Sequence, residues 1–484
     1  MPDDPRPPLG DISPETFRRH AHEVADWIAD YLAGVGDLPV LPRVRPGDVS
    51  GALPASPPEE PEPLDAILRD FREIIVPGTT HWNHPRFHAY FCSSGSGPGI
   101  LGEALAAALN VNAMVWRSGP APTELEKVAL DWLRDMLGLP GTFDGHIEDT
   151  ASVGNLVALA AAREHATGGQ AREKGLAGGP PLRVYASEEA HSSVRKAAMV
   201  LGLGTEGVRG IPTDDAFRMR PDALEAALAE DRRAGWKPMA VAATVGTTST
   251  TSVDPVPALA GVCEREGIWL HVDAAYGGSM GAVPEFRHVL DGCDRADSFV
   301  VNPHKWLFVP IDLSAVYSRR PDMVRRAFSL VPPYLMTPED GAARNLMDYG
   351  PALGRRFRAL KLWMVIRAFG TRGLAERIRA HVALAAELAG WVDGAEGWER
   401  MAPTPMSLVL LRHVPRPGVS EDALEKHNRE LMEAVNATGR AFLSHTLVRG
   451  RFAIRVAVGN LRTTREDVEE VWGLLRKKAG EVGG

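Results

Sequence analysis

The sequence predicts an α/β fold in which a large, mostly parallel sheet is followed by a smaller C-terminal α+β domain. From about Gly97 onward, alanine-rich helical stretches alternate with short β-branched runs, a pattern typical of parallel strands covered on both faces by helices. After a long helix containing Phe357 to Phe369, the pattern changes to two strand candidates, Leu408 to Arg412 and Phe452 to Val456, and helices that include Thr464 to Lys478. The strand candidates of the large sheet are Arg183 to Ala186, Met239 to Val245, Ile268 to Val272, Ser298 to Val301 and Leu313 to Tyr317.

Two amphipathic helices precede this sheet. Ser13 and Pro14 form a cap and first-turn signal, and apolar residues then recur at helical spacing from Phe17 to Tyr31. A proline-rich linker from Asp37 to Pro63 leads to the second helix, Leu64 to Ile75. Because the linker is extended, we expect both helices to pack on the main body or on a second subunit rather than on each other. The predicted parts are an N-terminal helical segment (1–95), a large domain (96–375) and a small C-terminal domain (376–484).

The composition is that of a globular protein, with 44% hydrophobic and 24% charged residues in 484. The net charge of -8 is spread along the chain without a long run of either sign, which argues against a nucleic-acid or membrane partner. Neither an apolar targeting segment near Met1 nor a membrane-length apolar stretch is present, so we expect a cytoplasmic location. The 3 cysteines are too few and too scattered for a disulfide framework or a zinc site.

Two polar residues follow two of the predicted strands and give the strongest indication of chemistry. Asp273 ends the run Leu270-His-Val-Asp273, and Lys305 lies in Ser298-Phe-Val-Val-Asn-Pro-His-Lys-Trp306. Because both strands deliver their ends to the carboxyl edge of the sheet, the two side chains should face one site. A lysine there can form a Schiff base with an aldehyde cofactor, while a carboxylate keeps a pyridinium nitrogen protonated. The pair therefore predicts pyridoxal 5′-phosphate (PLP), although either residue alone is more often a surface group or a turn residue.

Other runs offer the remaining parts of such a site. Thr150-Ala-Ser152-Val-Gly154-Asn155 precedes an apolar helix, whose N-terminal N–H groups and dipole favour an anion such as phosphate. His191, after the strand around Val184, can stack on the cofactor or handle a proton, although a structural histidine is the commoner case. The hydroxyl of Thr248 can reach a cofactor oxygen or simply belong to a turn.

Three histidines, His81, His84 and His88, are spaced as if for a metal, but Pro85 interrupts the helix that would place two of them on one face. We therefore expect no metal. The aromatic residues among them favour the wall of an apolar substrate pocket, with an ordinary core as the alternative. These aromatic residues are Trp82, Phe87, Tyr90 and Phe91.

Seven runs, distributed in order from the N-terminal helices to the last domain, carry a family resemblance. The two most specific are Trp269-Leu-His-Val-Asp-Ala-Ala-Tyr276 and Asn302-Pro-His-Lys-Trp306. The remaining five are His84 to Phe91, Pro122 to Glu126, Asp131 to Pro140, Ala190 to Val194 and Leu353 to Lys361. Together they resemble the group II PLP-dependent decarboxylases and, within that group, the aromatic-L-amino-acid decarboxylases.

The resemblance implies a PLP-dependent fold of type I, like that of aspartate aminotransferase, in a homodimer whose N-terminal helices cross onto the partner subunit. It implies that Lys305 carries the cofactor as an imine, that Asp273 pairs with the pyridinium and that His191 stacks on the ring. Ala151, Ser152, Asn302 and His304 are implied near the phosphate, Thr248 and Ala275 elsewhere on the cofactor, and Trp82, Tyr90 and Phe91 in the substrate pocket. Tyr349 resembles the tyrosine of a mobile catalytic loop and is our predicted proton donor, with His191 assisting.

The implied reaction is decarboxylation of an aromatic L-amino acid to an amine. Cys92, Asn112 and Met114 differ from the animal enzymes of the family, so the preferred ring stays open, and the segment from Tyr349 to Gly354 is shorter than theirs. A competing activity is that of an aldehyde synthase, in which oxygen reacts after CO2 leaves. Such enzymes replace the loop tyrosine by phenylalanine or the stacking histidine by asparagine, whereas this chain has both residues. Decarboxylation of glutamate or histidine is also possible, as is a catalytically silent protein that only binds PLP.

Overall fold

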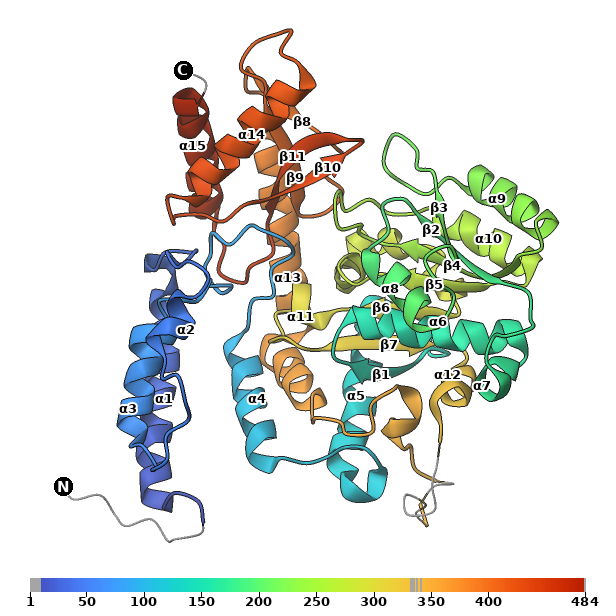
Figure 1. Ribbon diagram of the computed structural model, residues 1–484, viewed down its shortest axis with the longest axis horizontal. Coiled ribbons are helices and arrows are strands. Elements are labelled where there is room, and N and C mark those ends of the chain that lie inside the picture. The colour runs from blue at the N-terminus through green and yellow to red at the C-terminus, as the bar shows by residue number, and fades with distance from the viewer. Residues whose placement is uncertain (1–9, 331–335, 337, 340–341, 483–484) are drawn as a thin grey trace.

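The computed structural model describes residues 10–330, 336, 338–339 and 342–482. Figure 1 shows a large part built around a central sheet, a smaller part that contains the C-terminus, and a group of N-terminal helices standing beside both. The helices of the N-terminal group are α1 (Pro14–Gly34), α2 (Asp48–Ala52) and α3 (Leu64–Asp70).

The central sheet has seven strands in the order β1-β7-β6-β5-β4-β2-β3. All neighbouring pairs from β6 to β3 are parallel, whereas β7 runs antiparallel to both β6 and β1. This confirms the predicted mostly parallel α/β sheet. The strands are β1 (Asp144–Glu148), β2 (Leu182–Ser187), β3 (Val208–Ile211), β4 (Lys237–Thr244), β5 (Trp269–Asp273), β6 (Ser298–Val301) and β7 (Ser314–Ser318).

Helices cover both faces of this sheet, and alternate strand residues serve the two faces. In β4, Ala240 and Ala242 pack with the cluster that includes α6 and α8, while Val241 and Ala243 pack on the opposite side with α9 and α10. All four of these residues are buried, as expected for a strand covered on both faces. The helices of the large part are α4 (Gly97–Leu109), α5 (Pro120–Leu137), α6 (Ala151–Thr167), α7 (Gln170–Lys174), α8 (Ser192–Val200), α9 (Pro221–Arg233), α10 (Val256–Glu266), α11 (Pro303–Trp306) and α12 (Pro321–Phe328).

Helix α6 lies unusually close to the sheet, and this closeness sets the position of its N-terminus. A Cβ atom on Gly154 would lie only 2.8 Å from Val300 Cγ2 and 3.0 Å from Val316 Cγ2. Only glycine allows such an approach. The first turn of α6 is therefore held beside the carboxyl end of β6.

The smaller part contains a four-stranded antiparallel sheet in the order β10-β11-β9-β8, covered by α14 and α15. Its strands are β8 (Trp398–Arg400), β9 (Leu408–His413), β10 (Ser444–Val448) and β11 (Arg451–Ala457), and its helices are α14 (Glu421–Asn436) and α15 (Arg465–Val482). The long helix α13 (Ala359–Asp393) leads into it and contains a non-helical residue, Gly370. The predicted boundary between residues 375 and 376 falls inside α13, and the three-part division stays a prediction.

The N-terminal helices contact one another through aromatic rings, contrary to the expectation that they do not pack on each other. The Trp27 ring on α1 lies 4.8 Å from the Phe71 ring that follows α3. His84 and His88 contact different parts of the chain, since His84 Nε2 contacts the carbonyl of Gly36 and His88 Nδ1 that of Ala457. The His84 contact lies within the N-terminal segment, whereas the His88 contact joins this segment to the smaller part. Among the described residues, none of the helices is long and apolar enough to cross a membrane.

Candidate active site

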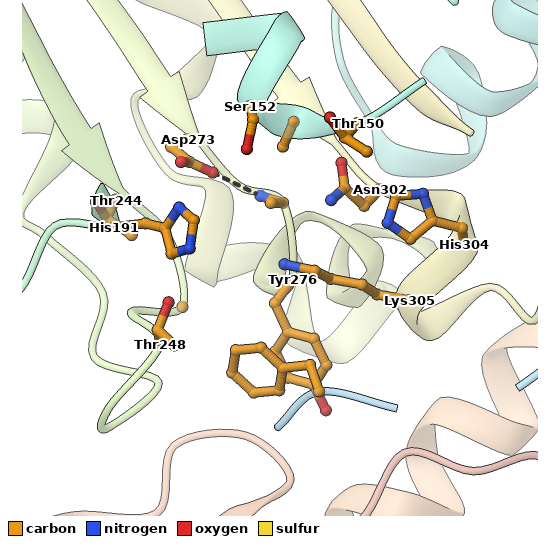
Figure 2. A pocket seen from close by; sticks show the side chains of 14 residues that line it. Thr150, Ser152, His191, Thr244, Thr248, Asp273, Tyr276, Asn302, His304 and Lys305 are labelled. Carbon is orange, nitrogen blue, oxygen red and sulfur yellow. Dashed lines mark hydrogen bonds between the residues drawn. The ribbon is translucent and has the colours of Figure 1, made fainter. Parts of the chain in front are cut away.

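The carboxyl ends of the parallel strands surround a cavity of about 220 Å³ (Figure 2). Its walls come from the loops after β1, β2, β4, β5 and β6, the position at which open α/β sheets bind their ligands. The lining residues are Phe91, Thr150, Ala151, Ser152, His191, Thr244, Gly246, Thr248, Asp273, Ala275, Tyr276, Asn302, His304 and Lys305. The cavity thus brings together every residue that the sequence placed around the cofactor.

Lys305 extends toward the centre of this cavity from the short helix α11 (Figure 2). The neighbouring Trp306 is fully buried, and its ring stacks on Tyr276 at 4.6 Å, which anchors the turn. The Nζ atom of Lys305 makes no hydrogen bond to any residue that the structure describes, and it lies 5.4 Å from the centre of the Phe91 ring. Burial lowers the pKa of this amine, although the charge of Asp273 raises it. A buried amine with a lowered pKa is suited to nucleophilic attack on an aldehyde.

Asp273, at the end of β5, has both of its carboxylate oxygens held by N–H donors. The backbone N–H of Ala275 donates to Oδ1 at 3.1 Å, and Asn155 Nδ2 donates to Oδ2 at 2.8 Å. The side chain is only 5% exposed and faces the same cavity as Lys305. This carboxylate is therefore fixed in a position where it can pair with a cationic ring nitrogen.

One side of the cavity offers donors suited to a phosphate. The backbone N–H groups of Ala151 and Ser152, in the first turn of α6, have no acceptor among the described residues, and the helix dipole favours an anion there. His304 Nδ1 accepts the backbone N–H of Leu313 at 3.0 Å. Burial, followed by the charge of Lys305, lowers the pKa of His304 to about 4, so the neutral ring presents Nε2–H as a donor. These groups, together with Lys305 and Asp273, fit PLP.

His191 lies at the mouth of the cavity as the N-cap of α8. Its Nδ1 accepts the backbone N–H of Ser193 at 3.2 Å and contacts Ser193 Oγ at 2.8 Å. Burial lowers the pKa of His191, while the charge of Asp273 raises it. With Nδ1 engaged in this way, Nε2 is the ring nitrogen available to the cavity.

Of the three predicted substrate-pocket residues, only Phe91 lines the cavity. Its ring stacks at 3.8 Å on Tyr276, so one wall is a series of apolar rings. Trp82 and Tyr90 lie outside, stacked on each other at 6.0 Å with 40% and 53% of their surface exposed. Within a single chain they form an open aromatic surface rather than part of the enclosed site.

Within one chain the structure does not bring Tyr349 to the cavity, so its role as the proton donor of a mobile catalytic loop stays a prediction. Tyr349 ends a buried 3-10 helix, Leu346–Tyr349, with its ring 5.7 Å from His146 and beneath the guanidinium of Arg344 at 3.9 Å. The neighbouring Asp348 pairs with Arg325 at 3.4 Å, which holds this helix against α12. Of the segment predicted to be mobile, Thr337, Asp340 and Gly341 lie outside the described residues.

Several residues near the cavity were not predicted as site residues, namely Thr244, Gly246, Tyr276 and Arg455. Arg455, from β11 of the smaller part, is 3% exposed and donates to the carbonyl of Thr248 at 2.8 Å and to Ser444 Oγ at 2.9 Å. Its guanidinium lies 5.4 Å from the Phe91 ring. An arginine inside the otherwise apolar strand Phe452 to Val456 is the signal in the sequence that could have identified it.

Comparison with known proteins agrees with this geometry. Residues 46–413 match the pyridoxal-dependent decarboxylase conserved domain. The chain belongs to the pyridoxal-dependent decarboxylase family. This decarboxylase is thus a PLP-dependent enzyme, as the paired Lys305 and Asp273 predicted.

The relatives of this decarboxylase are named either as decarboxylases or as aldehyde synthases. It is 42% identical to the tyrosine decarboxylase of Oryza sativa subsp. japonica, covering 97% of this chain and 92% of the relative. It is 38% identical to the phenylacetaldehyde synthase of Rosa hybrid cultivar, and the match covers 97% of this chain and 95% of the relative. The crystal structure of Oryza sativa TDC with PLP and tryptamine superposes with a TM-score of 0.95 at 39% identity, covering 98% of this chain and 100% of that one.

Proposed function

We propose that this enzyme decarboxylates an aromatic L-amino acid to the corresponding amine and CO2. The observation that carries the proposal is the convergence of Lys305, Asp273 and His191 on a cavity walled by the rings of Phe91 and Tyr276. An apolar ring wall favours an aromatic side chain over that of glutamate or histidine. The tyrosine decarboxylase of rice and the solved complex of a relative with tryptamine support the same substrate class.

The residues present divide the work of holding the cofactor. Lys305 would attach it covalently, Asp273 would pair with its ring nitrogen, and the α6 N-terminus with His304 would receive its phosphate. When bound, PLP supplies an electron sink for the bond between Cα and the departing carboxylate. The chain itself excludes water with Phe91 and Tyr276 and supplies a proton-handling group, His191, whose Nε2 is available to the cavity.

An aldehyde synthase is the second candidate because relatives of that name are as similar as the decarboxylases are. The phenylacetaldehyde synthases of rose and Arabidopsis thaliana are 38% and 40% identical to this chain. Against this candidate, the chain has histidine at position 191, where the resemblance associates asparagine with aldehyde formation. The deciding experiment supplies purified protein and PLP with tyrosine, tryptophan, phenylalanine, dopa, glutamate and histidine, and measures amine, aldehyde and CO2. Release of CO2 only from glutamate or histidine would contradict the aromatic substrate.

Replacing His191 by Asn is expected to lower the rate of amine formation at least about 100-fold and to raise the share of aldehyde. Without an imidazole at the cavity, the carbon that loses CO2 receives its proton more slowly, and oxygen has longer to react with it. The products to measure are amine, aldehyde, ammonia and hydrogen peroxide from one substrate. Tyr349→Phe is the matched control, since Tyr349 lies outside the cavity and should leave the amine-to-aldehyde ratio unchanged. The opposite pattern in the two variants would restore Tyr349 as the proton donor.

We further propose that the enzyme acts as a cytoplasmic homodimer. Helix α4 exposes Leu101, Leu105 and Leu109 at 61%, 52% and 61%, and Phe17 on α1 and Ile67 on α3 are exposed at 63% and 47%. Leucines at a spacing of four residues form one apolar face of α4. Such a surface is typical of a protein interface.

Removing residues 1–71 is expected to convert the dimer to monomer or aggregate, because it deletes the N-terminal helices that would cross onto the partner. Light scattering measures the change in mass. Leu105→Arg, which places a charge in the α4 face without removing any segment, should weaken the dimer as well. If both variants stay dimeric and fully active, the N-terminal helices and α4 do not form the interface.

A further inference from the structure

A buried chain of polar side chains leads from the middle of the large sheet to the cavity. Trp269 Nε1 donates to Ser298 Oγ at 2.8 Å, and the same oxygen lies 2.9 Å from His271 Nδ1. His271 Nε2 lies 2.9 Å from Asn155 Oδ1, and Asn155 Nδ2 donates to Asp273 Oδ2 at 2.8 Å. Trp269, His271 and Asn155 are completely buried, and Ser298 is 1% exposed. Without water, each of these groups depends on the next one for its hydrogen bond.

The direction of every hydrogen bond in this chain is determined by its two ends. The Trp269 indole can only donate, and the Asp273 carboxylate, which has two N–H donors around it, can only accept when ionised. Asn155 must therefore turn its NH2 group toward Asp273 and its oxygen toward His271. His271 then carries its hydrogen on Nε2, and its Nδ1 accepts the hydroxyl hydrogen of Ser298. Burial lowers the pKa of His271 to about 4, opposed by the charge of Asp273, so the ring stays in this neutral form.

The second N–H of Asn155 extends the network to the other side of the cavity. Asn155 Nδ2 also donates to Ser193 Oγ at 2.8 Å, and Ser193 Oγ lies 2.8 Å from His191 Nδ1. Because the backbone N–H of Ser193 already points at Nδ1, that nitrogen is an acceptor, and the Ser193 hydroxyl donates to it as well. A neutral His191 consequently holds its hydrogen on Nε2. A single amide, that of Asn155, thus connects the two cavity residues Asp273 and His191.

We propose that Asn155 is a positioning residue that fixes the carboxylate of Asp273 and the tautomer of His191 together, and that His271, oriented by Ser298 and Trp269, fixes Asn155. A reversed Asn155 amide would set its oxygen against the Asp273 carboxylate and would leave Ser193 without its donor. This inference rests on the proposed function, because Asp273 and His191 act on a ligand only if the cavity holds PLP.

The first test replaces Asn155 by Asp, which keeps the shape and removes both N–H donors. Purified apoprotein is titrated with PLP, and the dissociation constant and the visible absorption maximum of the bound cofactor are measured. We expect Asn155→Asp to bind PLP at least about tenfold more weakly, with a shifted absorption maximum, because two carboxylates then face each other. Asn428→Asp is the matched control: Asn428 is also completely buried and donates to two carbonyls, but it lies on α14 in the smaller part. Asn428→Asp should lower the melting temperature without changing the dissociation constant of PLP or its absorption maximum.

A pair of substitutions at His271 gives a second, independent test in case Asn155→Asp does not fold. Glutamine can donate from the position of Nε2, so His271→Gln should bind PLP within about threefold of wild type and absorb at the same wavelength. Leucine cannot donate, and His271→Leu should reproduce the weaker binding and the shifted maximum. This rescue by glutamine distinguishes a positioning role from mere filling of space.

The network has two arms that start at Asn155: one leads to Asp273, and the other leads through Ser193 to His191. Ser193→Ala tests the His191 arm alone, because it removes the hydroxyl between Asn155 and His191. We expect kcat to fall while KM and the PLP dissociation constant stay within about twofold of wild type. Unchanged kcat in Ser193→Ala would overturn the His191 arm, and unchanged PLP affinity and spectrum in Asn155→Asp or His271→Leu would overturn the Asp273 arm. If wild-type protein forms no borohydride-reducible link with PLP, it is the proposed function that fails, whatever the variants do.

Discussion

Replacing Lys305 by Ala is expected to lower kcat at least about 1,000-fold and to abolish covalent attachment of PLP. Lys305 is the lysine that lines the cavity, and its amine makes no hydrogen bond to any residue in the described part of the chain. No other lysine lines the cavity among these residues, so none can take over its role. The loss should therefore be one of chemistry and not of folding.

Borohydride reduction of the PLP-loaded protein, followed by mass analysis of its peptides, measures this attachment. Wild type should carry the reduced cofactor on the peptide that contains Lys305. Lys196→Ala is the matched control, since Lys196 is an exposed lysine on α8 near His191 but outside the cavity. Reducible attachment at the same stoichiometry in Lys305→Ala would show that another lysine carries the cofactor.

The pH dependence of attachment follows from the burial of Lys305. The neutral amine is the nucleophile, and burial lowers its pKa below the ordinary value of 10.5. The neutral fraction at a given pH is consequently larger than for a free lysine. We expect the rate of attachment to stay near its maximum down to a lower pH than for a lysine with the ordinary pKa, and to fall only when the pH drops through the lowered pKa of Lys305.

Five of the seven strands of the large sheet could be predicted from local composition, but β1, β3 and the order of the strands could not. β4, Lys237–Thr244, is a mostly apolar run of the kind that a strand covered on both faces requires. β1, Asp144–Glu148, escaped notice because it consists of Asp, Gly, His, Ile and Glu, of which only Ile favours strands. The antiparallel direction of β7 could not be predicted either, because the connection from β6, residues 302–313, contains only the short helix α11 and its length does not by itself exclude a parallel strand.

The site could be predicted where its residues directly follow strands, as Asp273 and Lys305 do. Residues that reach the cavity only through tertiary packing could not, and Arg455, which comes from the other sheet, is the clearest case. Tyr349 is the opposite case, since it was predicted at the site but lies outside the cavity within one chain. Its segment is rich in glycine, proline and polar residues, as mobile loops are. The sequence alone does not reveal that the Asp348–Arg325 ion pair and the Arg344 guanidinium hold Tyr349 against the protein body.

Replacing Asp273 by Ala is expected to lower kcat about 100- to 1,000-fold while leaving the protein folded. Among the described residues, Asp273 is the acidic residue that lines the cavity. The proposed role of its carboxylate is to keep the pyridine nitrogen of PLP charged. Removing it leaves the cofactor a weaker electron sink. The substitution also leaves two N–H donors, those of Asn155 and Ala275, without their acceptor, so a modest fall in the melting temperature is expected as well.

The comparison that separates these two effects uses Asp231, a second buried carboxylate, which pairs with Arg183 and Arg209 away from the cavity. Asp231→Ala removes the carboxylate that Arg183 and Arg209 share, although Arg209 keeps its ion pair with Glu230, and should lower the melting temperature at least as much as Asp273→Ala does. It should nevertheless leave kcat and the visible absorption of bound PLP close to wild type, because Asp231 does not line the cavity. Melting temperature, kcat and absorption spectrum are measured on both variants. Wild-type turnover in Asp273→Ala would mean that another group protonates the cofactor nitrogen, whereas an equal loss of kcat in both variants would mean that stability, and not the charge at Asp273, limits the reaction.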